Sequence, residues 1–130
     1  MFKSIIKILI GILCIIASGA SAFTSSSYLI ANTAIKLFDF EEAYLHFQSS
    51  DSNFSESDLH NELLTLVHLN LLSNAEEVAR KILKMNNLNQ EAWIVYLTYA
   101  KIHNNAYAFD EYRKKIKEPE MALLNYIFFN

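Results

Sequence analysis

The chain has 130 residues, of which 52% are hydrophobic, and it contains only two Gly and one Pro. Both glycines, Gly11 and Gly19, lie in the first 22 residues, so the rest of the chain has none of the glycines that tight β-hairpin turns require. The net charge is -3, and this acidic balance argues against a nucleic-acid partner because binding to phosphates needs an excess of grouped Lys and Arg. We therefore expect an all-α protein.

The first 22 residues have the pattern of a signal peptide. The cationic start MFKSIIK leads into the apolar run ILIGILCIIASGA, and the small-x-small tripeptide Ala20-Ser21-Ala22 follows. We expect cleavage after Ala22 and an exported protein, periplasmic or secreted, that begins at Phe23.

Two other interpretations of this leader remain open. The apolar run could stay uncleaved as a membrane anchor, although it is shorter than the roughly 20 residues that span a bilayer. Lipid attachment at Cys14 is less favoured because the large residue Leu13 precedes it. Cys14 is the only cysteine, so cleavage would leave a protein without disulfides or thiol ligands.

An internal repeat follows the leader. The segments 38–50, 73–86 and 104–117 can be aligned with one another in two columns of residues. The first column holds a small residue in each segment, and the second column lies four positions later. A small residue lets two helices approach closely, and the side chain one turn later fills the gap between them. The two columns are Ala43, Ala75 and Ala108, and then Phe47, Ala79 and Tyr112.

Each aligned segment is predicted to be the second helix of a hairpin. The segments before the second and third of them, 56–72 and 89–103, have apolar residues at helical spacing. These residues are Leu59, Leu63, Leu66 and Leu69 in the former, and Trp93, Tyr96, Leu97 and Ala100 in the latter. Capping boxes are predicted at three helix starts, from the pairs Asp39 and Glu42, Ser55 and Asp58, and Ser73 and Glu76.

These residues resemble the tetratricopeptide repeat, a helix-turn-helix unit of 34 residues. The second helix of that unit has Ala and then an aromatic residue four positions on, as in Ala43 and Phe47 or Ala108 and Tyr112, and Trp93 stands near the start of a first helix. Ala79 replaces the aromatic residue in the second unit. The resemblance covers about 24–118 and implies about three stacked hairpins, a short solenoid, over 23–118. An irregular helical bundle is the alternative.

The segment 119–130 is predicted to be an apolar helix that starts a fourth unit. Met121, Leu124 and Phe128 share one face, to which Ile127 and Phe129 add apolar bulk, and nothing is expected to cover it. Since a repeat stack needs a polar outer face at its end, we expect that this helix begins further repeats or docks on a partner or a second copy. A cap that packs inward is the alternative.

The sequence shows no pattern of a metal or catalytic site. His60-Asn61-Glu62 resembles the start of a zinc deaminase motif, but the cysteines of that motif are missing. The acidic pairs Asp39 with Glu42 and Glu76 with Glu77 are explained by their positions in first helical turns. We expect a protein that is not an enzyme and has no cofactor.

The resemblance implies a groove lined by the first helices, which would bind a peptide or protein. The implied groove residues are Tyr28, Asn32 and Lys36 in the first unit, His60, Leu64 and His68 in the second, and Ile94, Thr98 and Lys101 in the third. Relatives that grip a terminal carboxylate have basic residues where this chain has Tyr28, Glu91 and Val95.

We therefore expect an exported interaction scaffold. The alternatives are a structural segment of a longer envelope solenoid, a protein that self-associates through 119–130, and an interaction module held at a membrane by its leader.

Overall fold

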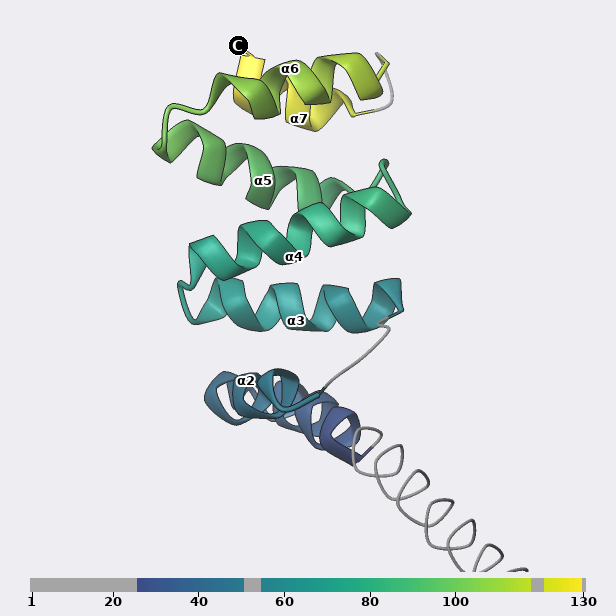
Figure 1. Cartoon of the computed structure of the whole chain (residues 1–130), viewed down its shortest axis with the longest axis vertical. Coiled ribbons are helices and arrows are strands. Elements are labelled where there is room, and N and C mark those ends of the chain that lie inside the picture. Colours follow the sequence, from purple (N-terminus) through teal and green to yellow (C-terminus); the bar gives the residue numbers. More distant parts are fainter. Residues whose placement is uncertain (1–25, 51–54, 118–120, 130) are drawn as a thin grey trace, which may run out of the picture. The chain divides into compact units, whose positions relative to one another are not determined.

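The computed structural model describes residues 26–50, 55–117 and 121–129 (Figure 1), and every regular element in these ranges is a helix. The all-α prediction is confirmed. The chain divides into two compact units, Met1–Ser52 and Asn53–Asn130. The predicted leader with its cleavage site after Ala22 lies outside the described residues, as does Pro119.

The first unit contains one described helical hairpin. Residues 26–36 form its first helix and Phe40–Gln48 form its second, α2. Its core is small, because three of the four buried hydrophobic side chains between the helices are alanines: Ala31, Ala34, Ala43 and Phe47. Tyr28 and Ile35 pack against this core.

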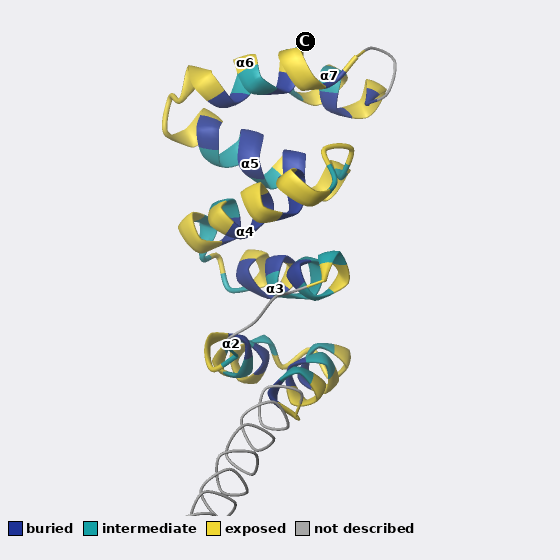
Figure 2. Ribbon diagram, turned by 45° about the vertical axis from the view of Figure 1, so that its right-hand side comes forward, coloured by how far each residue is buried: buried dark blue, intermediate teal, exposed yellow. Residues whose placement is uncertain are grey.

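The second unit contains five described helices in sequence. They are α3 (Glu56–His68), α4 (Leu72–Met85), α5 (Gln90–Ile102), α6 (Ala106–Lys115) and α7 (Ala122–Phe129). Within this unit α4 packs between α3 and α5, and α5 also contacts α6 and α7. Figure 2 shows buried residues on the sides of α4 and α5 that face neighbouring helices.

The same turn joins the two helices of each hairpin. A residue with positive φ follows each first helix: Phe38 at 59°, Asn70 at 56° and Asn104 at 54°. The next residue donates its backbone N–H to the carbonyl five positions earlier, at 2.9, 2.9 and 2.8 Å in chain order. This hydrogen bond is that of a Schellman motif, whose left-handed position usually holds glycine and sometimes asparagine. Three hairpins therefore close alike without a glycine.

The repeat columns are buried as predicted. Ala43, Ala75 and Ala108 are fully buried, and the residues four positions later are at most 3% exposed. The four residues of α5 predicted to face inward are also buried, namely Trp93, Tyr96, Leu97 and Ala100. Leu69 is only partly buried, because α3 ends at His68 and not at residue 72.

Of the three predicted capping boxes, one is complete, one forms only in half and one is wrong. Ser55 and Asp58 form a complete capping box. Asp39 caps α2 by accepting a hydrogen bond from the Glu42 N–H, whereas the Glu42 carboxylate pairs with His46 at 3.1 Å. No such box forms at Ser73, because α4 already begins at Leu72 without a side-chain cap. The turn at Asn70 starts the helix before Ser73 is reached, and Glu76 instead pairs with Arg80 at 3.0 Å.

The prediction that nothing covers the apolar face of the last helix is also wrong. Met121 and Leu124 are each only 1% exposed. The Tyr112 hydroxyl on α6 donates to Asn125 Oδ1 at 2.9 Å, and the Tyr112 ring stacks on Phe129. One face of α7 thus packs inward, as the alternative interpretation proposed.

Candidate functional site

The structure places the nine implied groove residues on three first helices. Tyr28, Asn32 and Lys36 lie on helix 26–36 of the first unit, where the Tyr28 ring meets Phe47 edge-on with ring centroids 5.7 Å apart. Tyr28 thereby contributes to the core of its own hairpin. The other six residues lie in the second unit, on α3 and α5.

Three of these six residues line one hollow between α3 and α5. This groove hollow has a volume of about 180 Å³. It is formed by His60, Leu63, Leu64 and Val67 from α3 and by Glu91, Ile94 and Val95 from α5. His68, Thr98 and Lys101 lie farther along the same helices and do not line it.

The groove hollow presents apolar side chains to solvent. Leu64 is 37% exposed, Val67 is 42% exposed and Ile94 is 37% exposed, whereas Leu63 is buried. His60 and Glu91 also line it, but the surface that the hollow presents is entirely apolar. A concave apolar surface of this kind is typical of sites that bind an apolar ligand group.

A network of asparagines fixes the start of α5 relative to α3. Asn86 and Asn89, in the turn between α4 and α5, each donate a side-chain N–H to Glu56 Oε1, at 2.9 and 3.1 Å. These two hydrogen bonds lower the pKa of Glu56 from its ordinary value. Asn89 also caps α5. The two helices that form the groove hollow are therefore tied together at one end.

Trp93 also stabilises the turn between α4 and α5, through a hydrogen bond from its buried ring. Its Nε1–H donates to the Asn87 carbonyl at 2.7 Å, and its ring lies edge-on to Tyr112 with centroids 5.1 Å apart. Because Trp93 is fully buried, it fixes the position of α5 and hence of Ile94 and Val95 beside it. Trp93 does not line the groove hollow itself, but it fixes the backbone of the helix that carries three of the lining residues.

Sequence reasoning missed four lining residues: Leu63, Val67, Glu91 and Val95. Val67 lies three positions after Leu64, and Glu91 and Val95 flank Ile94 on α5. Neighbours at helical spacing could have identified Val67 and Glu91. Leu63 was predicted only as core, and the structure shows that this buried side chain also lines the hollow.

A second, polar hollow lies beside α4 and α6, with a volume of about 190 Å³. The Tyr96 hydroxyl there donates to Glu111 Oε2 at 3.0 Å, and Lys115 Nζ donates to Glu111 Oε1 at 2.7 Å. Burial, and then the bond with Glu111, raises the pKa of Tyr96 to about 12. Tyr96 thus serves as a hydrogen-bond donor between α5 and α6.

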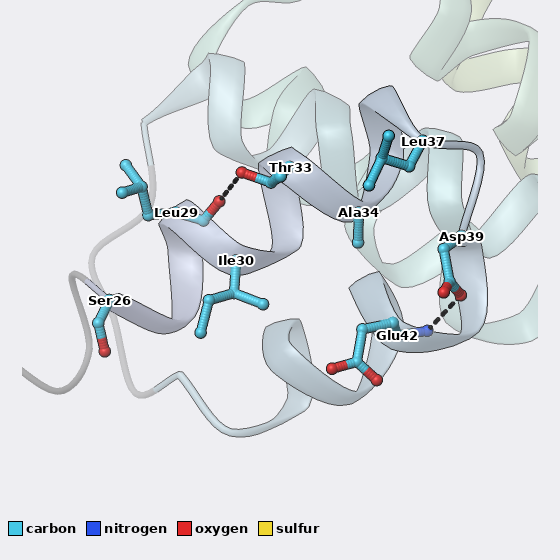
Figure 3. A pocket seen from close by; sticks show the side chains of 8 residues that line it. All are labelled: Ser26, Leu29, Ile30, Thr33, Ala34, Leu37, Asp39 and Glu42. Carbon is cyan, nitrogen blue, oxygen red and sulfur yellow. Dashed lines mark hydrogen bonds between the residues drawn. The ribbon is translucent and has the colours of Figure 1, made fainter.

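A third hollow, the N-terminal hollow, lies on the first hairpin and has a volume of about 360 Å³ (Figure 3). Leu29, Ile30 and Leu37 supply its apolar part, and they are 73%, 44% and 73% exposed. Asp39 and Glu42, at the start of α2, line it as well.

Among the described residues, no three His, Cys, Asp or Glu side chains gather as a metal site would require. None of the described helices combines the length and apolar character needed to span a membrane.

The comparisons with known proteins give no relative: no family model, curated protein or solved structure matches this chain.

Proposed function

We propose that this chain is a non-catalytic protein-binding scaffold of the tetratricopeptide type, which holds a peptide segment in the groove hollow. The observation that carries the proposal is the apolar lining between α3 and α5, where Leu64, Val67 and Ile94 remain exposed on one shared surface. The repeated turn at Phe38, Asn70 and Asn104 supports three like hairpins, and we propose α7 as the start of a fourth.

The chemistry of the groove hollow favours one kind of peptide. Its volume of about 180 Å³ suits a single large apolar side chain, which would rest on Leu63 between Leu64 and Ile94. The lining offers no polar surface, so the hollow selects for apolar contact alone. A free terminal carboxylate fits poorly because it would lose water there and gain no hydrogen-bond partner. We therefore propose an internal apolar segment as the ligand.

Peptide display against the full chain tests this function. Leu64→Lys with Ile94→Lys places two charges in the groove hollow, and Met85→Lys with Leu88→Lys makes the same change at two other exposed apolar positions. We expect the wild type and the control variant to enrich the same apolar peptides and the groove variant to lose them. Equal enrichment by all three proteins, with helicity unchanged by circular dichroism, would overturn the assignment of the groove.

Export is part of the proposal and has its own test. The cationic start, apolar run and Ala20-Ser21-Ala22 support a cleaved leader. Expression of the full chain in a bacterial host, followed by fractionation and N-terminal sequencing, should give a periplasmic protein that begins at Phe23. An intact N-terminus in the membrane fraction would favour the anchored alternative.

A further inference from the structure

The N-terminal hollow occupies a face that is covered in the third hairpin. The turn residues Phe38 and Asn104 mark equivalent positions 66 residues apart, so Leu29 and Ile30 correspond to Val95 and Tyr96. Tyr96 is only 4% exposed, whereas Ile30 is 44% exposed.

The preceding hairpin lies against that face of α5. Val95 adjoins α3 in the groove hollow, and Tyr96 adjoins Arg80, Leu83 and Lys84 of α4 in the polar hollow. In the first hairpin the corresponding residues open into the N-terminal hollow, and among the described residues those that line it all belong to this hairpin (Figure 3). The N-terminal hollow therefore has the shape and polarity of a surface on which another helical unit packs.

The outer face of α7 is also apolar and open. Its inner face packs inward, but Leu123, Tyr126 and Ile127 are 59%, 70% and 49% exposed. They lie at i, i+3 and i+4, which places them on one side of the helix. None of the other described helices covers this side. The second unit thus has an apolar surface next to its last described helix.

Acidic residues lie at the N-terminal hollow, and basic residues lie on the helix before α7, where Arg113 and Lys115 also pair with Asp110 and Glu111 of the same helix. Asp39 and Glu42 line the N-terminal hollow, and Glu41 lies between them in the sequence. Beside α7, the last turn of α6 contributes Arg113, Lys114 and Lys115, and the Arg113 guanidinium lies 4.7 Å from the centre of the Phe129 ring. Opposite charges around apolar patches favour one docking orientation and disfavour like-with-like pairing.

We propose that the outer face of α7 in one copy docks on the N-terminal hollow of a second copy, so that the chains associate head to tail. Such a contact is heterologous and leaves one unused surface at each end, so it can continue into short chains or rings. Each patch has only three main apolar side chains, well short of the roughly 800 Å² per partner of a standard interface. The association is therefore weak and depends on concentration. It does not involve the groove hollow.

Site-directed cross-linking between two tagged copies tests this arrangement. All copies carry Cys14→Ser to remove the natural thiol; one copy carries Leu29→Cys and the other Ile127→Cys, and a short bismaleimide joins nearby thiols. We expect a cross-linked dimer from this mixed pair and none from Leu29→Cys or Ile127→Cys alone. A chain with both cysteines should give a ladder of oligomers. Lys84→Cys, on the exposed side of α4, is the negative control.

Two outcomes would overturn the proposal. A dimer from Ile127→Cys alone would show symmetric pairing through α7. No adduct from the mixed pair would show that something else covers the N-terminal hollow, such as residues 1–25 or a different protein. The groove variant Leu64→Lys with Ile94→Lys should still cross-link, so a failure here is distinct from a failure of the proposed peptide binding.

Charge exchange provides a second test at the same interface. Glu41→Lys in the copy with Leu29→Cys should lower the yield of the mixed dimer several-fold at low salt. Lys114→Glu in the other copy should restore it, because the two charges are then again opposite. A loss that Lys114→Glu leaves unrepaired would overturn the proposed orientation.

Discussion

The first and third hairpins close with the same turn but enclose different cores. In the first hairpin the buried hydrophobic side chains are mainly alanines, with Phe47 as the one large member. In the third, Trp93 is fully buried against Tyr112 and holds the Asn87 carbonyl through its ring N–H. The turn sets the shape of each hairpin, whereas the volume of the buried side chains sets its stability. We therefore expect the third hairpin to be the more stable.

Removing Trp93 tests the expected higher stability of the third hairpin. Trp93→Ala should lower the free energy of unfolding by about 3–5 kcal/mol, because it leaves a cavity and frees the Asn87 carbonyl. Urea denaturation followed by circular dichroism measures the loss. Tyr107→Ala removes an aromatic ring from α6 that is 68% exposed, and it should cost less than about 0.5 kcal/mol. A similar loss in both variants would contradict the central role of Trp93.

Truncating Phe47, the one large residue in the core of the first hairpin, tests the less stable half of this comparison. Phe47→Ala should cost up to about 3–5 kcal/mol, as for other buried phenylalanines, but the loss should be confined to residues 26–50. Hydrogen exchange read by mass spectrometry should show faster exchange there and unchanged protection in α3 to α6. Leu45→Ala, at a position 63% exposed, is the matched control. Faster exchange throughout would mean that the two units unfold together.

The sequence predicted the helices well because the repeated columns are a local pattern. Ala43, Ala75 and Ala108 all became contact points between helices, and the inward residues of α5 were correct. The turns were harder to foresee, since the left-handed positions hold Phe38, Asn70 and Asn104 where glycine is the usual signal.

The candidate site was predicted only in part. His60, Leu64 and Ile94 were named from the sequence and line the groove hollow, but its other lining residues and the bonds of Glu56 with Asn86 and Asn89 depend on residues more than 25 positions apart. No local pattern indicates such pairings. The sequence did not predict that one face of α7 is covered, for the same reason. That contact depends on Tyr112 of α6, whose ring stacks on Phe129.

The turn residues allow a finer test of the first hairpin. Phe38 has a φ of 59°, a conformation that costs a residue with a side chain roughly 1–2 kcal/mol. Phe38 is 80% exposed, and its ring lies edge-to-face with that of Phe40, with centroids 6.4 Å apart. Phe38→Gly should therefore raise the free energy of unfolding of this hairpin by up to about 1 kcal/mol, measured as slower hydrogen exchange over 26–50.

Asn70→Gly is the matched change in the second hairpin. Asparagine tolerates the left-handed conformation better than phenylalanine, so this variant should gain only a few tenths of a kcal/mol. Equal gains in both variants would show that the side chain at this position does not matter, and that the first hairpin owes its lower stability to its core alone.

The smallest expected effect concerns two carboxyl groups on α3, Glu56 and Glu62. Bonds from Asn86 and Asn89 lower the pKa of Glu56, whereas burial raises the pKa of Glu62 above its ordinary value of 4.5. Glu56 thus adds stability that is present above its unfolded pKa and is lost as the pH falls through the lower folded value. Glu62 does the opposite, since its contribution is full below its unfolded pKa and is lost as the pH rises through the raised folded value.

The two variants should therefore shift the melting temperature in opposite directions. At pH 7, Glu62→Gln should stabilise the second unit by less than about 0.5 kcal/mol, and Glu56→Ala should destabilise it. Melting curves between pH 3 and pH 7 should show both differences shrinking toward acid, as the carboxyls become protonated in both the folded and the unfolded chain. Parallel profiles would mean that the bonds of Glu56 with the turn before α5 do not persist in solution. The link that ties α3 to α5 at one end of the groove hollow would then be absent.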